Sequence, residues 1–366
     1  MVEMNRRKFL LASAGAGALG LAGTAAVSWP ELMRAAQDRP LADGAVASMP
    51  AAPGRPPGIL VLITLNGGND GINTVIPYAS PTYHAARPEL AYAPSDVLAL
   101  DEHLGLNPGL PGLAGLWKQQ RLAIVRGVGY PKPDRSHFRS MDIWQTASPQ
   151  EPVSTGWIGR WLDATGDDPL RAVNMGAVLP PLAIGDTTTA AALPLTGAAS
   201  APVLADTMTV LGNTNPHDTP AMAMVAASYR AAAAVHTALQ PVITADESAG
   251  GAEQKGGTNA LAKKLDVVAR CIAARVPTRV YCVQLDGFDT HADERRTHQR
   301  LLTTFDTAVT GFLDQVASHD QGRNVVVMAY SEFGRRVGAN ASQGTDHGTA
   351  GPVFVAGDPV KGGFYG

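Results

Sequence analysis

Five runs of consecutive apolar residues recur along the chain, each about as long as a β-strand. None of the runs alternates apolar and polar residues, as a strand with one solvent-exposed face would. This pattern is typical of strands that are buried on both faces of a parallel sheet. We therefore predict a mostly parallel sheet in a folded part that begins at Gly58. The runs span residues 59–65, 122–126, 279–285, 324–330 and 352–356.

Longer segments with helical character separate the apolar runs. The alternation of buried strands and helices predicts an α/β fold, a doubly wound and mostly parallel sheet with helices on both faces. Residues 180–258 depart from this pattern because they are rich in Ala, Thr, Gly and Pro and poor in charge. We interpret them as an inserted cap region. The predicted helices span residues 109–120, 137–146, 222–239, 259–274 and 301–318.

The first 57 residues have the character of a targeting segment and a linker. Arg6, Arg7 and Lys8 precede an uncharged run that is rich in Ala, Gly and Leu, which is typical of a secretory signal. The adjacent arginines favour a twin-arginine signal, and the glycines in the run disfavour a membrane-spanning helix. We predict a signal over residues 1–29 and a proline-rich linker over residues 30–57. The predicted location is periplasmic or extracellular, with membrane contact only during export by the twin-arginine machinery.

Composition narrows the class of protein. The 366 residues carry a formal net charge of −3, so the chain is not a basic nucleic-acid binder. Charged residues make up 17%, below the roughly 25% of average domains, and the apolar content is that of a folded chain rather than a disordered one. The two cysteines, Cys271 and Cys282, cannot form a disulfide framework. We interpret them as buried apolar side chains rather than as a disulfide or redox pair.

Polar residues collect next to the predicted strands. Residues 66–73, 286–291 and 331–336 each follow a strand, and residues 344–349 precede the last one. Because ligands bind beyond the carboxyl ends of the strands in open α/β sheets, we expect these clusters to converge. Several carboxylates in one crevice would repel one another, and a divalent cation would relieve this repulsion. The acids and histidines concerned are Asp70, Asp286, Asp289, Glu332, Asp346, His291 and His347.

The mixture of donor types bears on the metal. Carboxylate and imidazole ligands together suit Zn²⁺ or Mn²⁺, whereas an all-oxygen set suits Ca²⁺ or Mg²⁺. Each cluster alone is equally typical of a turn, so the prediction rests on their convergence. We predict a divalent metal site that binds Zn, Mn or Ca, with the number of ions left open. The predicted ligands are Asp70, Asp286, His291, Glu332, Asp346 and His347.

A loop that enters a helix supplies the candidate catalytic groups. Ser136 would cap the predicted helix at residues 137–146, or its hydroxyl would attack a phosphate or sulfate ester held at the helix N-terminus. Arg135 and Arg139 could clamp the same anion. His137 could orient Ser136, bind the metal or cap the helix, and the sequence leaves these alternatives open.

Three motifs taken together resemble one bacterial exported family, domain of unknown function 1501. They are residues 66–74, Ser136-His137-Phe138 with residues 144–146, and residues 331–335 with residues 346–348. The resemblance covers residues 58–366. It implies the doubly wound α/β core of the alkaline phosphatase and sulfatase superfamily, whose members usually hydrolyse esters with bound metal. It also implies a further helix after residues 361–366, where this chain ends, so we expect a truncated C-terminal end.

The resemblance also implies roles for individual residues. Asp70 is similar in place to the first metal aspartate of the superfamily, and Ser136 to the attacking hydroxyl. Asp286 and His291 resemble an Asp-x-x-x-His metal pair, although their spacing is one residue longer. His347 resembles the last histidine of the same metal site.

One motif departs from the pattern of the superfamily. Many relatives carry Ser-Asp-His-Gly where this chain has Ser-Glu-Phe-Gly at residues 331–334. Glu332 can replace the aspartate, but Phe333 cannot replace the histidine. A one-metal enzyme, or a fold that has lost the chemistry, is therefore an alternative to a two-metal site.

These observations lead to one main functional hypothesis and one alternative. The main hypothesis is an exported metal-dependent hydrolase of phosphate or sulfate esters, acting on a small molecule or a polymer. The alternative is a non-catalytic extracytoplasmic protein that binds metal or takes part in surface assembly. A nucleotide-dependent redox enzyme is disfavoured because no G-x-G-x-x-G motif follows a predicted strand and no C-x-x-C motif is present. Among the remaining histidines, His298 is the next candidate ligand.

Overall fold

The computed structural model describes residues 58–166, 168, 170–193, 209–223, 225–230, 233–234, 237–238 and 259–366. The predicted signal at residues 1–29 and the predicted linker at residues 30–57 lie outside this part of the chain. Within the described part, no helix combines the length and the apolar character that crossing a membrane requires.

A mixed eight-stranded sheet forms the centre of the fold. Its order is β11-β5-β10-β9-β1-β8-β6-β7. β1 lies parallel to β8 and β9, whereas β10 lies antiparallel to β9 and β5. The predicted mostly parallel α/β sheet is therefore confirmed. The strands are β1 (Ile59–Asn66), β5 (Leu122–Val128), β6 (Ala172–Asn174), β7 (Ala191–Ala192), β8 (Val280–Asp286), β9 (Val325–Tyr330), β10 (Gly351–Ala356) and β11 (Gly363–Tyr365).

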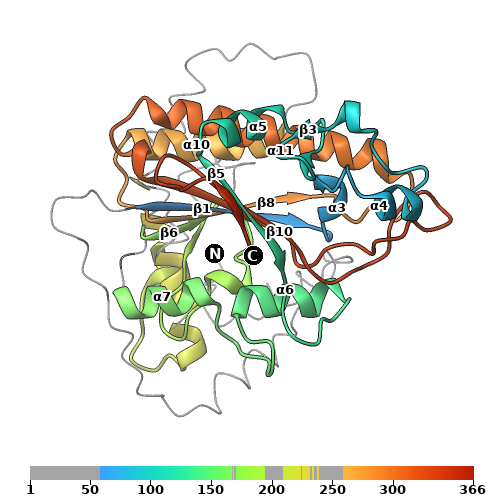
Figure 1. The fold of residues 1–366 in the computed structure, drawn as a ribbon. Coiled ribbons are helices and arrows are strands. Elements are labelled where there is room, and N and C mark those ends of the chain that lie inside the picture. The colour runs from blue at the N-terminus through green and yellow to red at the C-terminus, as the bar shows by residue number, and fades with distance from the viewer. Residues whose placement is uncertain are drawn as a thin grey trace.

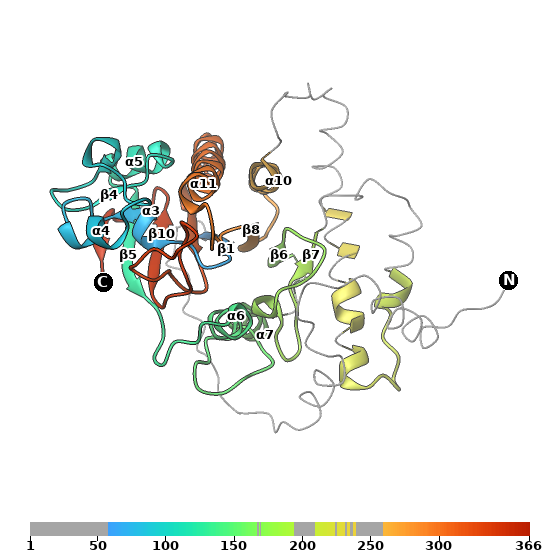
Figure 2. The same ribbon diagram turned by 90° about the vertical axis from the view of Figure 1, so that its right-hand side faces the viewer.

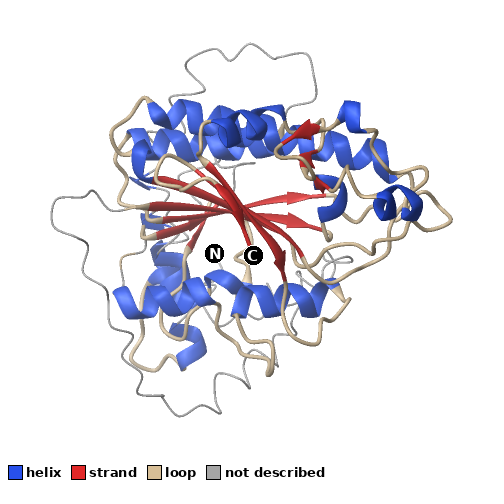
Figure 3. Ribbon diagram, viewed as in Figure 1, coloured by secondary structure: helices blue, strands red, loops and turns tan. Residues whose placement is uncertain are grey.

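Helices cover both faces of the sheet. α5 (Pro111–Lys118), α10 (Ala260–Ala273) and α11 (Glu294–Ala317) lie on one face, and α6 (His137–Thr146) and α7 (Trp157–Thr165) lie on the other (Figures 1 and 2). Figure 3 shows the strands as a twisted layer between these helices. α6 has the predicted bounds.

The burial of β1 on both faces of the sheet explains its continuous apolar run. Val61, Ile63 and Leu65 belong to the hydrophobic cluster that includes α10 and α11, whereas Leu62 belongs to the cluster that includes α7. All four side chains are almost fully buried. Because successive residues of a strand point to opposite faces, both sets must be apolar when helices cover both faces.

Smaller elements complete the described fold. A second, three-stranded sheet has the order β2-β4-β3. β7 falls within the segment that we interpreted as an insertion, yet it extends the main sheet by pairing with β6. The helix expected at residues 222–239 lies partly outside the described residues. The smaller elements are α3 (Gly71–Thr74), β2 (Val75–Ile76), α4 (Pro81–Ala86), η1 (Pro94–Asp96), β3 (Leu98–Ala99), β4 (Gly105–Leu106), η2 (Pro181–Ala183) and η3 (Gly322–Asn324).

The strand directions bring four connections to one edge of the sheet. β1, β8 and β9 end there because they are parallel. The connection that follows β9 leads into β10, which begins at this edge because it runs antiparallel to β9. β5 also ends here because it runs antiparallel to β10. The loops approach closely: a Cβ added to Gly67, whose φ is +117°, would lie 2.4 Å from the backbone nitrogen of Asp289. Glycine is therefore required at position 67.

Candidate metal centre

Three side chains from distant parts of the sequence converge at this edge. His137 is the first residue of α6, Asp289 lies between β8 and α11, and His347 precedes β10. One donor atom from each lies within 4.8 Å of the others. The Asp289 Oδ1 atom is 3.4 Å from His137 Nε2 and 3.2 Å from His347 Nε2. Such a group can hold one metal ion.

His291 adds a fourth donor beside this group. Its Nε2 atom lies 3.0 Å from Asp289 Oδ1 and 2.9 Å from His347 Nε2. The imidazole of His291 is 45% exposed, so the centre is open to solvent on this side. We call His137, Asp289, His291 and His347 the metal cluster.

Hydrogen bonds fix which ring nitrogens are free to bind metal. His347 Nδ1 lies 2.7 Å from the carbonyl oxygen of Arg135, which can only accept a hydrogen bond, so Nδ1 carries the proton. His137 Nδ1 lies 2.8 Å from Glu332 Oε1 and donates to that carboxylate. In the neutral form of each ring, Nε2 therefore keeps its lone pair. Anchoring of one ring nitrogen so that the other can ligate is usual for metal-binding histidines.

The cluster fits a metal ion on a further observation. His137 Nε2 is buried and has no hydrogen-bond partner among the described residues. A buried polar atom without a partner carries a substantial energetic cost. A cation at the meeting point of the Nε2 atoms of His137 and His347 and the Asp289 carboxylate would satisfy it.

Glu332, predicted as a ligand, lies behind His137. Its side chain is 2% exposed. Burial raises the pKa of its carboxyl, but the hydrogen bonds from His137, the backbone N–H of Gly67 and Ser331 outweigh burial and lower it. The same contact with Glu332 raises the pKa of His137. Glu332 is thus an ionised hydrogen-bond acceptor for a metal-cluster histidine.

Arg335 holds the cluster's carboxylate and the surrounding loops together. Its guanidinium is fully buried. Burial raises the pKa of Asp289, but the hydrogen bond from Arg335, the contact with His347 and nearby positive charge lower it overall. The Arg335 donors bind Gly68 O at 2.7 Å, Thr345 O at 2.7 Å, Gly67 O at 2.5 Å, Phe288 O at 3.0 Å and Asp289 Oδ1 at 2.7 Å.

Asp70 and Asp286, both predicted ligands, have other partners. Asp70 is fully buried and forms an ion pair with Arg87, whose Nη2 lies 2.9 Å from Oδ1. Burial raises the pKa of Asp70, but the charge of Arg87 and the hydrogen bonds from Glu294 and Arg87 together outweigh burial, and the pKa falls to about 2. Asp286 accepts a hydrogen bond from Asn66 at 2.7 Å. The structure records no contact between either carboxylate and the metal cluster.

Asp346 and His291 lie side by side, as the sequence led us to expect. Asp346 Oδ1 is 3.6 Å from His291 Nδ1 and 3.3 Å from the amide nitrogen of Asn340. The hydrogen bond from Asn340 lowers the pKa of this exposed carboxyl. Asp346 therefore lies on the far side of the His291 ring from the cluster and can orient that ring.

Asp289 is the member of the cluster that the sequence analysis left out of the ligand set. The family spacing favoured Asp286, which is the last residue of β8 and is paired in register with Asn66 of β1. Asp289 lies three residues further, beyond the strand, where the loop turns toward His347. The Asp-x-His spacing of Asp289 and His291 was the available signal.

The candidate catalytic residues lie on and before the first turn of α6. Ser136 occupies the N-cap position, but its hydroxyl makes no capping hydrogen bond and the residue is exposed. Arg139 forms an ion pair with Asp142 of the same helix. Arg135 is exposed, and its backbone carbonyl anchors His347. Ser136 is therefore available for chemistry rather than committed to capping.

Phe333 forms an aromatic wall of the site. Its ring centroid is 4.8 Å from that of His137 and 4.7 Å from that of His347, and the residue is 2% exposed. A Cβ on Gly68 would lie 2.2 Å from the Phe333 ring. The position where relatives carry a second-site histidine is thus filled by a tightly packed hydrocarbon ring.

A second buried polar group supports the loops from behind. Glu294, at the start of α11, accepts a hydrogen bond from Thr345 at 2.6 Å. Burial and the neighbouring Asp70 raise the pKa of Glu294 to about 9. His298 lies 2.8 Å from Asn69 Oδ1, and burial lowers its pKa to about 4. His298 is therefore a neutral structural histidine.

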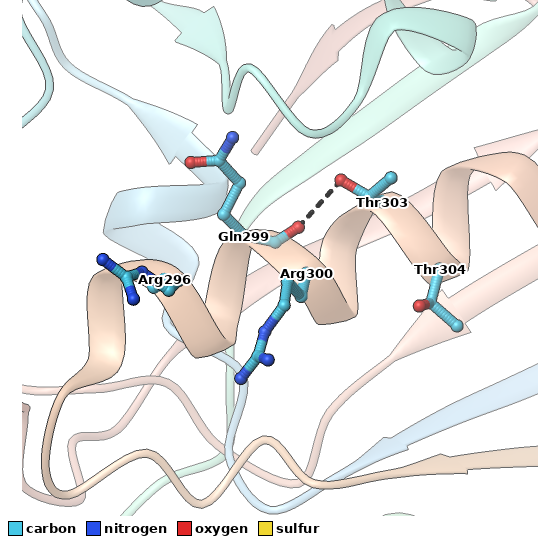
Figure 4. A pocket seen from close by; sticks show the side chains of 5 residues that line it. All are labelled: Arg296, Gln299, Arg300, Thr303 and Thr304. Carbon is cyan, nitrogen blue, oxygen red and sulfur yellow. Dashed lines mark hydrogen bonds between the residues drawn. The ribbon is translucent and has the colours of Figure 1, made fainter. Parts of the chain in front are cut away.

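A surface groove on α11 lies apart from the metal cluster and the candidate catalytic residues. It encloses about 470 Å³, and Figure 4 shows the side chains that line it. None of them belongs to the metal cluster or to the candidate catalytic residues. The groove is lined by Arg296, Gln299, Arg300, Thr303 and Thr304.

Comparisons with solved structures gave remote similarities. A protein of the alkaline phosphatase superfamily from Vibrio parahaemolyticus is 13% identical with a TM-score of 0.38, over 84% of this chain and 62% of that one. The C-terminal periplasmic domain of EcEptC from Escherichia coli, in complex with Zn, is 10% identical with a TM-score of 0.38, over 82% and 73%. Alkaline phosphatase from the Antarctic bacterium TAB5 is 11% identical with a TM-score of 0.36, over 84% and 94%.

Sequence comparisons gave a clearer result. No curated protein matched the chain. A family model matched residues 126–366, which include the last three residues of β5, all four residues of the metal cluster, Glu332 and Arg335. This match confirms the resemblance drawn from the motifs. The chain belongs to the family described as "Protein of unknown function (DUF1501)".

Proposed function

We propose that this protein is an exported, metal-dependent hydrolase of phosphate or sulfate esters, with its centre at the metal cluster. The observation that carries the proposal is the convergence of His137, Asp289 and His347, with the unpartnered Nε2 of His137 facing the other two donors. The substrate would be a small molecule or a polymer that carries the ester. Export by the twin-arginine route rests on residues 1–29 alone.

The donor set points to Zn²⁺ as the ion, with Mn²⁺ second. Three imidazoles and one carboxylate match the borderline character of Zn²⁺, whereas Ca²⁺ prefers six to eight oxygen ligands. A divalent ion bound here would stabilise a deprotonated hydroxyl beside it and the negative charge that develops on ester oxygens. The packed ring of Phe333 leaves hydrocarbon where a second ion would need a ligand, which favours one ion.

The protein's own groups would bind and attack the ester. Ser136 directly precedes His137, and its exposed hydroxyl makes no capping hydrogen bond, so it is the candidate nucleophile. The N-terminus of α6, a helix of ten residues, offers backbone N–H groups to anionic oxygens. Arg135, which is exposed, would supply a positive charge at the same place. Arg139 is less available because Asp142 already neutralises it.

Metal analysis and turnover test the proposal together. We expect the purified full chain to contain about one zinc per molecule and to cleave 4-nitrophenyl phosphate or 4-nitrophenyl sulfate. The Ser136→Ala variant should keep the metal and lose at least roughly a thousandfold in kcat, the scale for loss of a nucleophile. Normal turnover by Ser136→Ala would remove the nucleophile assignment. Absence of both metal and turnover would refute the whole proposal.

A non-catalytic metal-binding role is the second candidate. The four donors of the metal cluster would complete the tetrahedral set of a structural zinc site, whereas catalytic sites usually leave one position open. In that case the protein would bind one zinc, lose thermal stability when a chelator removes it, and cleave neither ester.

A further inference from the structure

An open recess lies next to the metal cluster. It encloses about 290 Å³, at the lower end of the range for small-molecule sites, which suffices for one ring but not for a large ligand. One wall follows β5 and the other precedes β10. The lining residues are Gly127, Gly129, Tyr130, Pro131, Pro133, Thr349 and Ala350.

The same two segments hold the metal cluster. The first wall continues through Arg135 to His137, and the second wall begins two residues after His347. The hydrogen bond of 2.7 Å from His347 Nδ1 to the Arg135 carbonyl joins the two segments. The recess and the cluster are therefore built on the same two chain segments, and Thr349 of the recess is two residues from His347 of the cluster.

The wall is rigid and carries a flat aromatic side chain. The hydroxyl of Tyr130 lies 2.5 Å from Ser140 Oγ, accepts from the backbone nitrogen of Asp134 at 3.0 Å and donates to the carbonyl of that residue at 3.1 Å. These contacts fix the tyrosine ring. The proline rings of the lining are rigid by their covalent structure. A preformed wall costs little conformational entropy when a ligand binds.

The lining is also uncharged and kept open by glycine. No Asp, Glu, Lys, Arg or His lines the recess, so it is unsuited to the anionic part of an ester. A Cβ at Gly129 would lie in van der Waals contact with the Cβ of Ala350, at 3.4 Å, so a larger side chain at position 129 would pack against Ala350 and take up part of the recess. Thr349 adds a hydroxyl at the exposed rim.

We propose that this recess binds an uncharged ring in the alcohol part of the ester whose anionic group is bound at the metal cluster. This inference rests on the proposed function for the identity of the ester, but ring binding is testable without turnover. A ring would stack on Tyr130 and the prolines. The ring belongs either to an aryl group or to a sugar.

Saturation-transfer NMR on the zinc-loaded full chain tests the recess directly. The probes are phenol for an aryl ring and methyl glucoside for a sugar ring. We expect one of them to bind the wild type, and the Gly129→Leu variant to bind it roughly tenfold more weakly, a difference of about 1.4 kcal/mol. Gly311→Leu is the matched control, because Gly311 is an exposed residue of α11 with open space around it.

The outcomes separate this inference from the proposed function. Weaker ring binding by Gly129→Leu, with zinc content and melting temperature unchanged, supports the recess even if the wild type cleaves no ester. Equal ring binding by Gly129→Leu, or no binding of either probe by the wild type, overturns the inference even if ester hydrolysis is found. If Gly129→Leu does not fold, Ala350→Leu fills the recess from the opposite wall and is judged by the same criteria.

Discussion

The Nδ1 atom of His137 lies 2.8 Å from the Oε1 atom of Glu332, although 195 positions separate the two residues in the sequence. Glu332 is itself held by the backbone N–H of Gly67. The carboxylate therefore fixes the orientation and the protonation state of the imidazole, and it leaves Nε2 to face Asp289.

Removing the Glu332 carboxylate should weaken metal binding. We expect Glu332→Ala to lower zinc affinity about 10-fold to 100-fold, as is usual when the partner of a ligating histidine is lost. Glu332→Gln should lose less, because its amide oxygen still accepts from Nδ1. Competition with a chromophoric chelator measures the affinity. Asp286→Asn is the control and should bind zinc normally; weaker binding by this control would show that Asp286, and not Asp289, is the ligand.

Metal should stabilise the fold. With free zinc at a thousand times the dissociation constant, binding to the native state alone adds about 4 kcal/mol to the free energy of unfolding. We expect the melting temperature of the wild type to rise by several degrees on adding zinc and to fall again with a chelator. His347→Ala should show neither change. A zinc-dependent shift of equal size in that variant would exclude His347 as a ligand.

Stability should fall as the pH rises through the neutral and weakly alkaline range. The pKa of Glu294 rises from 4.5 to about 9 on folding, so between these values the native state holds a proton that the unfolded state lacks, and stability declines with pH. His298, with a pKa lowered from 6.5 to about 4, acts in the opposite sense between these two values. The two effects therefore oppose each other below pH 6.5. Above pH 6.5 the effect of Glu294 remains, and the raised pKa of His137 acts in the same sense.

The Glu294→Gln variant isolates this effect. Its amide resembles the protonated carboxyl, can donate to Asp70 and can accept from Thr345. We expect the metal-free wild type to lose up to roughly 3 kcal/mol between pH 6.5 and 9 and the variant to lose much less. Urea denaturation at several pH values in the presence of a chelator measures this. Parallel pH profiles for both proteins would show that Glu294 is ionised in the native state.

Arg87 should matter for stability and not for metal binding. Arg87→Met leaves the buried carboxylate of Asp70 without its ion pair, and such a loss typically destabilises a protein by about 3–5 kcal/mol. The double variant Asp70→Asn with Arg87→Met should recover part of this stability, because neither charge of the ion pair then remains buried. Zinc stoichiometry should stay at the wild-type value in both. Loss of zinc from the double variant alone would place Asp70 among the ligands.

The sequence predicted the sheet and α6 well because their signals are local. A strand buried on both faces needs an unbroken apolar run, and β1 has one. The start of α11 was predicted at Leu301 but lies at Glu294. The buried face of its first two turns consists of Glu294 and His298, and their polarity interrupts the apolar period that marks a helix.

The candidate site was predictable as a place but not in all of the side chains that meet there. Strand order and direction decide which polar loops meet, and the family motifs brought His291, His347 and Glu332 to the right edge. Asp70 does not join these residues because it pairs with Arg87. Asp286 does not join them because it lies in register with Asn66 on the neighbouring strand. Both partnerships are tertiary contacts that no local spacing reveals. They decide that Asp289, rather than Asp70 or Asp286, is the carboxylate of the metal cluster.

The buried guanidinium of Arg335 has a consequence for how the site assembles. Its donors are shared among the loop after β1, the loop after β8 and the far end of the loop between β9 and β10, to which Arg335 itself belongs. No subset of these loops can satisfy the group, so a state with one loop detached leaves a buried cation short of acceptors. The three loops should therefore open and close as one cooperative unit. Amide hydrogens around the site should then exchange with solvent at a common rate, whichever loop they belong to.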